Sequence, residues 1–288
     1  MSSGGVIRRV LAVAGLTFRE AIRRRVVLAA LLMSAGFLLL YGFGLYLGAH
    51  SVWTGAQAGF SELMRRAVAA QMLYLGLFPA SLLVALTAVF ASVGTISSEL
   101  DSGVIYGTLA RPIRRSELVL GKFVGLAAML VVYAALMGGA VVGLARWQMA
   151  TPLLPTWPAA VALLVFEPLP LLALAVLGST RLPTLANGVM CTAAYGVAFI
   201  GGLIESIGGL IGNATMRNIG IVSSLLMPLD SVHRKALSLL LPAGLLVEQG
   251  GIPGMGGSTP SVWAIVYAVV YVAILVALAM RVLARRDL

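Results

Sequence analysis

Few side chains in this sequence could do chemistry, and they are widely separated along the chain. The single cysteine, Cys191, lies in an apolar run, and the histidines, His50 and His233, lie far apart and outside such runs. One cysteine cannot form an internal disulfide, and no Cys/His spacing typical of a metal site is present. We therefore expect a small buried thiol at Cys191, surface or interfacial histidines, and no metal site.

Glu167 differs from the other acidic residues because it lies near the middle of a long apolar run, followed by Pro168 and Pro170. If that run crosses a membrane, an ionised carboxylate there is costly, so it should face protein or water, or be protonated. One interpretation is contact with a substrate or ion along a pathway. The other is a neutral carboxyl bonded to a backbone carbonyl that the prolines leave free. Glu205 is expected at the outer membrane interface.

The composition is that of an integral membrane protein. Of the 288 residues, 60% are hydrophobic and 10% charged, where a soluble domain carries about 25% charged residues. A membrane-spanning helix needs about 20 mostly apolar residues. Runs of this kind cover residues 26–47, 68–96, 122–145, 157–178, 183–204 and 262–282. Because the runs are continuous rather than alternating, they predict an all-α protein with six spans, forming one transmembrane domain over residues 1–288.

The basic residues predict the orientation of the chain. With the N-terminus inside, 14 of the 20 Lys and Arg residues fall on inner segments and 6 on outer ones. This bias predicts that both termini are cytoplasmic. It also explains the net charge of +10 by contact with anionic lipid, without nucleic acid.

Residues 5–25 precede the first span and alternate between two faces. Ile7, Leu11, Phe18 and Ile22 share an apolar face, while the arginines lie mostly opposite them. This pattern predicts an amphipathic helix at the membrane surface.

Residues 97–121 form the largest predicted cytoplasmic loop. Asp101 and Ser102 could cap a short helix, which Pro112 would end. Ser116 could then cap the next helix, with Glu117 in its first turn. A short apolar helix between two caps suits docking to a soluble partner.

The segment SGVIYGTLARPIRRSELVLGKFVG resembles the cytoplasmic loop of permease subunits of type-2 ATP-binding-cassette (ABC) exporters. The matching residues are Ser102, Gly103, Leu109, Ala110, Arg111, Pro112, Ile113, Arg115, Glu117, Gly121 and Lys122, whereas Val104 and Arg114 depart from the pattern. TFREAIRRRVVLAALL resembles the family's elbow helix and first span, and LGSTRLPTLANG its turn between spans four and five.

The resemblance implies a non-catalytic permease in the plasma membrane, with no cofactor of its own. A separate ATPase subunit would bind ATP and Mg and dock on the coupling loop, and a second permease copy or a paralogue would complete the dimer. Lipids, peptides, drugs and ions all remain possible cargo. The predicted docking residues are Gly103, Leu109, Arg111, Pro112, Ile113, Arg114, Arg115, Glu117 and Lys122. No P-loop is present, since the Gly121–Lys122 pair lacks the preceding glycine and the following Ser or Thr.

Residues 206–261 form a long predicted extracytoplasmic segment. MPLDSVHRKA within it resembles a family stretch that forms short helices dipping into the outer leaflet. The alternative is an ordinary amphipathic surface helix.

The rival hypothesis is a proton-coupled carrier or an intramembrane enzyme centred on Glu167. An enzyme should place paired reactive groups at one membrane depth, but the spans show one such carboxylate and no histidine. A carrier should show inverted repeats, and none is visible.

Overall fold

The computed structural model describes residues 3–53, 62–97, 114–150, 153–241 and 260–285. Within these ranges the chain forms helices and no strand. Six segments are long and apolar enough to cross a membrane: Arg25–His50, Met64–Ser92, Arg115–Met149, Trp157–Ser179, Thr184–Gly209 and Val262–Ala284. The prediction of an all-α protein with six spans is confirmed.

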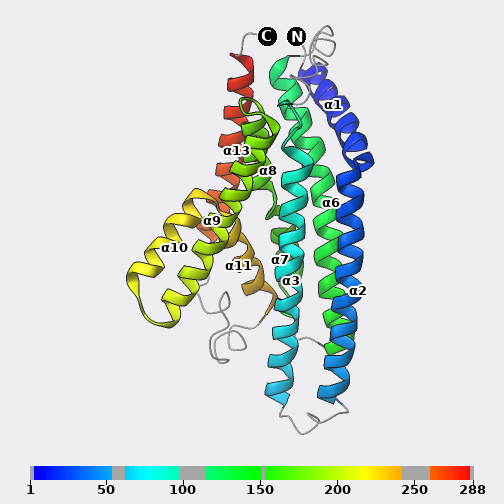
Figure 1. The fold of residues 1–288 in the computed structure, drawn as a ribbon, viewed down its shortest axis with the longest axis vertical. Helices are drawn as coiled ribbons and strands as arrows, with labels where there is room; N and C mark the ends of the chain where they lie inside the picture. Colours follow the sequence, from blue (N-terminus) through cyan, green and yellow to red (C-terminus); the bar gives the residue numbers. More distant parts are fainter. Residues whose placement is uncertain (1–2, 54–61, 98–113, 151–152, 242–259, 286–288) are drawn as a thin grey trace.

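Three long helices run most of the length of the molecule: α2 (Arg25–Trp53), α3 (Glu62–Ser92) and α6 (Arg115–Met149). Both chain termini lie at the same end (Figure 1), which we call the terminal end. Helix α13 (Val262–Ala284) returns the chain to it. Large apolar side chains of α2 and α13 point outward, as expected of helices that are apolar all round.

The fourth span is broken into α7 (Trp157–Phe166) and α8 (Leu169–Ser179). The break coincides with Glu167 and Pro168, because a proline lacks the amide hydrogen that would continue the helix. Helix α7 packs on α11 (Leu229–Leu240), whereas α8 packs on α13. The two halves share α6 as a neighbour, but each packs mainly on a different further helix.

Helices α9 (Thr184–Leu210) and α10 (Ala214–Leu226) form a hairpin that projects to one side (Figure 1). Gly212 turns the chain at φ 69°, and the Asn213 side chain accepts hydrogen bonds from the amides of Thr215 and Met216. Helix α11 then turns back into the bundle. The backbone N–H of Leu154 donates to the Leu240 carbonyl at 2.9 Å, which ties the end of α11 to the segment before α7.

The predicted N-terminal amphipathic helix is confirmed as a helix, α1 (Ser3–Arg23). It slants along α6 and leads into α2 (Figure 1). A Cβ at Gly121 would overlap Val13, and one at Gly125 would lie 2.5 Å from the Ala14 carbonyl oxygen. The absence of side chains at these two positions therefore lets α1 and α6 touch.

Four glycine pairs at i, i+4 spacing could let helices pack closely. Gly121/Gly125 does so, and in the pair Gly208/Gly212 only Gly208 closely approaches another helix. At Gly44, Gly48, Gly139 and Gly143, no described atom lies within 4 Å of the position of an added Cβ.

Candidate functional site

At the terminal end, side chains from three other parts of the chain donate hydrogen bonds to carbonyl groups at or just after the C-terminal end of α3. The last carbonyls of a helix have no partner within the helix. Arg24 donates to the Ala91 carbonyl at 3.3 Å and Lys122 to the Thr95 carbonyl at 2.6 Å. These contacts join the α1–α2 junction and α6 to the segment that directly precedes residue 98.

Asn187 supplies the third contact. Its fully buried amide donates to the Val93 carbonyl at 2.9 Å and to the Ala175 carbonyl at 2.8 Å. Cys191 donates to the Asn187 Oδ1 at 3.6 Å, and it is buried as expected. Asn187, which lies on α9, therefore links the segment at the C-terminal end of α3 to α8 and α9.

A bidentate ion pair joins α1 to the first turn of α6. Arg9 Nε and Nη2 donate to the Glu117 carboxylate at 2.8 and 2.9 Å, and the Arg114 amide donates to it at 3.3 Å. The hydrogen bond to Glu117 raises the pKa of Arg9, which keeps it charged. We call Arg9, Arg24, Glu117, Lys122 and Asn187 the terminal-end cluster.

The predicted docking residues fall into two groups. Gly103, Leu109, Arg111, Pro112 and Ile113 lie outside the described residues. Of the rest, Arg114 is exposed and Arg115 half-buried, but Glu117 and Lys122 are only 4% and 5% exposed. The Glu117 and Lys122 side chains bond other residues of this chain, in the first turns of α6. The predicted N-cap at Ser116 is wrong: α6 begins at Arg115, with Arg114 as its N-cap.

A second polar cluster lies inside the bundle. Glu167 is 4% exposed, and its Oε2 lies 3.0 Å from Nδ1 of His233. The expectation that His233 lies at a surface or interface is therefore wrong, since it is 8% exposed. The alternative in which Glu167 bonds a freed backbone carbonyl is also not observed, because the imidazole is its partner.

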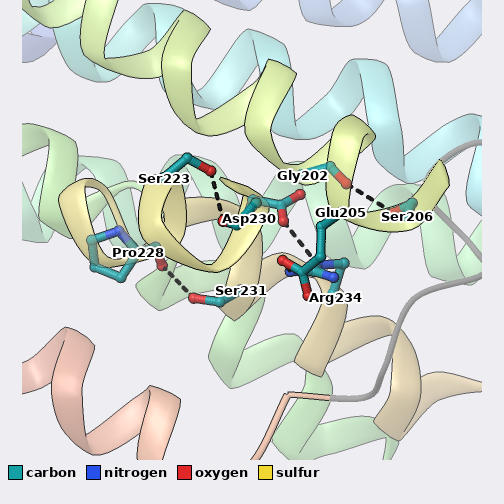
Figure 2. Close-up of polar contacts among 9 residues, drawn as sticks. Gly202, Glu205, Ser206, Ser223, Pro228, Asp230, Ser231 and Arg234 are labelled. Atoms are coloured by element: carbon teal, nitrogen blue, oxygen red, sulfur yellow. Dashed lines mark hydrogen bonds and ion pairs between the residues drawn. The ribbon is translucent and has the colours of Figure 1, made fainter. Parts of the chain in front are cut away.

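Arg234 joins two further carboxylates to this cluster. Its Nη2 donates to Glu205 Oε2 at 2.6 Å, and its Nε lies 2.8 Å from Asp230 Oδ2. Figure 2 shows the three side chains converging between α9 and α11. Glu205 is 4% exposed, so its side chain is buried in the protein. We call Glu167, Glu205, Asp230, His233 and Arg234 the mid-bundle cluster.

Two glycines make room for these carboxylates. A Cβ at Gly202 would overlap the Asp230 carboxylate, and a Cβ at Gly220 would overlap the Glu205 side chain. Burial raises the pKa of the Asp230 carboxyl, and the Arg234 and His233 charges oppose that rise.

The mid-bundle cluster borders a cavity of about 40 Å³. Its lining comes from α3, the α7–α8 break, α9 and α11, and consists of Tyr74, Phe78, Ser81, Glu167, Tyr195, Phe199, Gly202, Leu203, Leu229, Asp230, His233 and Arg234. Neither Nε2 of His233 nor Nη1 of Arg234 has a hydrogen-bond partner within the described parts of the chain.

Sequence reasoning identified Glu167 but not its partners. Helix α11 is not an ordinary amphipathic surface helix, because most of its side chains, including those of His233 and Arg234, are buried. The signal in the sequence for this packing is glycine within a span, such as Gly202, which leaves room for a charged side chain of another helix. Among the described residues, no group of three or more His, Cys, Asp or Glu could hold a metal ion.

Comparison with known families adds one finding. A family model described as "ABC-2 family transporter protein" matches residues 11–288. This confirms the resemblance seen in the sequence. A search of curated proteins finds no match.

Proposed function

Since the chain belongs to the ABC-2 transporter family, we propose that it is the membrane subunit of an exporter driven by a separate ABC ATPase. It would lie in the plasma membrane as a multi-pass permease. By the bias of basic residues toward the segments at the terminal end, that end faces the cytoplasm. The ATPase subunit would hold ATP and Mg, and this chain would be non-catalytic.

The observation that supports ATPase coupling is the construction of the terminal-end cluster. Residues 98–113 connect α3 to α6 in the sequence. The segment at the C-terminal end of α3 is bonded to Arg24, Lys122 and Asn187, and the start of α6 is bonded to Arg9 of α1. A displacement of the loop would therefore reach α1, α6 and α9 together, because their contacts at this point are side-chain hydrogen bonds rather than lipid.

This arrangement separates docking from transmission. Gly103, Leu109, Arg111, Pro112, Ile113, Arg114 and Arg115 are proposed to touch the ATPase, whereas the buried Glu117 and Lys122 pass the motion on. A second copy of the chain, or a paralogue, would complete the dimer, in which each permease receives one ATPase.

Co-purification with the ATPase encoded next to this chain tests the proposal. The wild-type chain should retain the ATPase, and the double variant Arg111→Glu with Arg115→Glu should not. The matched control is Arg66→Glu with Arg217→Glu, two exposed arginines predicted to lie on the other side of the membrane. This control changes the net charge equally and should retain the ATPase.

Two outcomes would contradict the proposal. The first is a folded wild-type chain that retains no ATPase, which would remove the exporter interpretation. Alternatively, both double variants could lose the ATPase equally, which would mean that net charge rather than the loop determines binding. Folding of each variant is checked by size-exclusion chromatography in detergent.

A further inference from the structure

The mid-bundle cluster contains more negative than positive charge. Its three carboxylates, Glu167, Glu205 and Asp230, face one guanidinium, that of Arg234. With a neutral His233, two negative charges are therefore left over, and with a protonated one, a single charge is left over. An uncompensated charge in such a site is costly, so the cluster favours the uptake of a cation.

The hydrogen-bonding groups indicate which cation would fit. When neutral His233 donates from Nδ1 to Glu167, its Nε2 is an acceptor, and this atom is buried with no partner in the described chain. The carboxylates of Glu167 and Asp230 line the same cavity and can accept as well. A primary ammonium group has three N–H donors, which matches these three acceptors.

The remaining walls suit an organic cation. Tyr74, Phe78, Tyr195 and Phe199 line the cavity. Their rings form a chain of neighbours, with centroids 6.3 Å apart for Tyr74–Phe78, 5.5 Å for Phe78–Phe199 and 6.5 Å for Tyr195–Phe199. Aromatic faces attract ammonium groups through their quadrupole.

The size of the cavity restricts the ligand. A volume of about 40 Å³ is room for about three water molecules, since one water needs roughly 10–15 Å³ on this measure. An ammonium nitrogen with a short carbon stem occupies similar space, whereas a tetramethylammonium ion is larger.

We propose that this cavity binds the primary ammonium group of an organic amine, held by Glu167, Asp230 and Nε2 of His233 against the aromatic walls. Assigning the amine to the exporter's cargo rests on the function proposed above. The binding itself does not, because every residue involved belongs to this chain.

Ammonium binding should compete with a proton. Burial lowers the pKa of His233, but the charges of Glu167 and Asp230 outweigh that effect and raise it. The empty site therefore holds a proton on the imidazole more readily than free histidine does. The other titratable groups facing the site are Glu205, Tyr195, Tyr74 and Arg234. The ammonium ligand and the imidazole proton exclude each other. Binding should therefore strengthen as the pH rises, up to the range where the amine itself deprotonates.

The test is a saturation-transfer NMR titration of the full chain in lipid nanodiscs with methylammonium chloride, in the absence of any ATPase. Dissociation constants on the order of millimolar are expected for so small a ligand. Methanol and tetramethylammonium chloride at equal concentration should give no saturation transfer, and sodium chloride at equal concentration should not displace methylammonium. Binding should tighten as the pH rises from about 6 through and above the usual range of histidine, because the pKa of His233 is raised.

The variants locate the site. Asp230→Asn and Glu167→Gln should each weaken binding by about tenfold or more, as loss of a charged acceptor does. Phe199→Leu changes no charge and should weaken binding by about threefold or more. Glu62→Gln removes an exposed carboxylate that pairs with Arg66 and should leave binding unchanged.

Equal binding of methanol, or methylammonium binding that survives all three cavity variants, would overturn the proposal. If either carboxylate variant fails to fold, Phe199→Leu still decides the matter. Failure of the ATPase co-purification leaves this result untouched. Methylammonium binding without any effect on ATP hydrolysis by the assembled complex would overturn the assignment to cargo.

Discussion

The terminal-end cluster and the mid-bundle cluster are both largely buried and both charged, but they satisfy their charges differently. At the terminal end, Arg24, Lys122 and Asn187 donate to carbonyls at or near helix ends, and Glu117 has one matching arginine. In the mid-bundle cluster, the carboxylates outnumber the cations, and nitrogen atoms of His233 and Arg234 remain unpartnered among the described residues. The first arrangement is complete and suits transmission of force, whereas the second is incomplete and suits a ligand.

The largest effect is expected from Arg234→Met. This change leaves the Glu205 and Asp230 carboxylates without their cation, and breaking a buried pair in this way costs about 3–5 kcal/mol. Thermal unfolding in detergent should show a much lower midpoint. Arg66→Met is the control, because its pair with Glu62 is exposed and is worth less than about 1 kcal/mol. Similar decreases of the unfolding midpoint in both variants would mean that the buried pairs of Arg234 contribute no more stability than the exposed pair of Arg66.

The next effect separates two glycines of the same helix. Gly125→Ala places a methyl group against the backbone of α1 and should cost about 1–3 kcal/mol through overpacking. Gly143→Ala meets no atom and should stabilise α6 by up to about 1 kcal/mol through helix propensity. Opposite signs in thermal unfolding support close contact between α1 and α6, and equal signs contradict it.

A smaller loss is expected for Lys122→Met, which keeps the length of the side chain but leaves the Thr95 carbonyl unbonded. An unsatisfied buried acceptor of this kind costs about 1–2 kcal/mol. The functional loss should exceed the loss of stability, so ATPase stimulation by the permease should fall while ATPase binding persists. If binding is lost as well, Lys122 belongs to the docking surface instead.

The smallest effect on stability is expected from the Arg9–Glu117 pair, because Arg9 is partly exposed. Arg9→Glu should lower the unfolding midpoint modestly, and less so at high salt, since salt screens charges near the surface. The exchange Arg9→Glu with Glu117→Arg should restore it. No restoration would show that the position of Glu117 against the Arg114 amide matters more than the ion pair.

Hydropathy was enough to predict the six spans, since each is a long apolar run. The local pattern also predicted the amphipathic helix before them. The position of α11 was not predictable, because MPLDSVHRKA carries four charged or titratable residues within ten positions and therefore indicates a surface helix. Its partners, Glu167 and Glu205, lie 66 and 29 residues away from His233 and Arg234. Only the folded bundle brings their charges together.

Asn187 shows the same limit from the other direction. A single amide in an apolar span gives no indication of its partners, which lie 94 and 12 residues away in the chain. The buried roles of Glu117 and Lys122 were hidden because charged residues flanking a loop are normally exposed.

Because of its break, the fourth span consists of two helices that can bend relative to each other rather than one continuous helix. Its lower arm, α7, is fastened to α11, and its upper arm, α8, to α13. Glu167 is the joint itself, and it is also part of the cavity wall. In the proposed exporter, a movement of α8 relative to α7 that shifts Glu167 away from His233 would weaken the hold of the cavity on the proposed ammonium ligand.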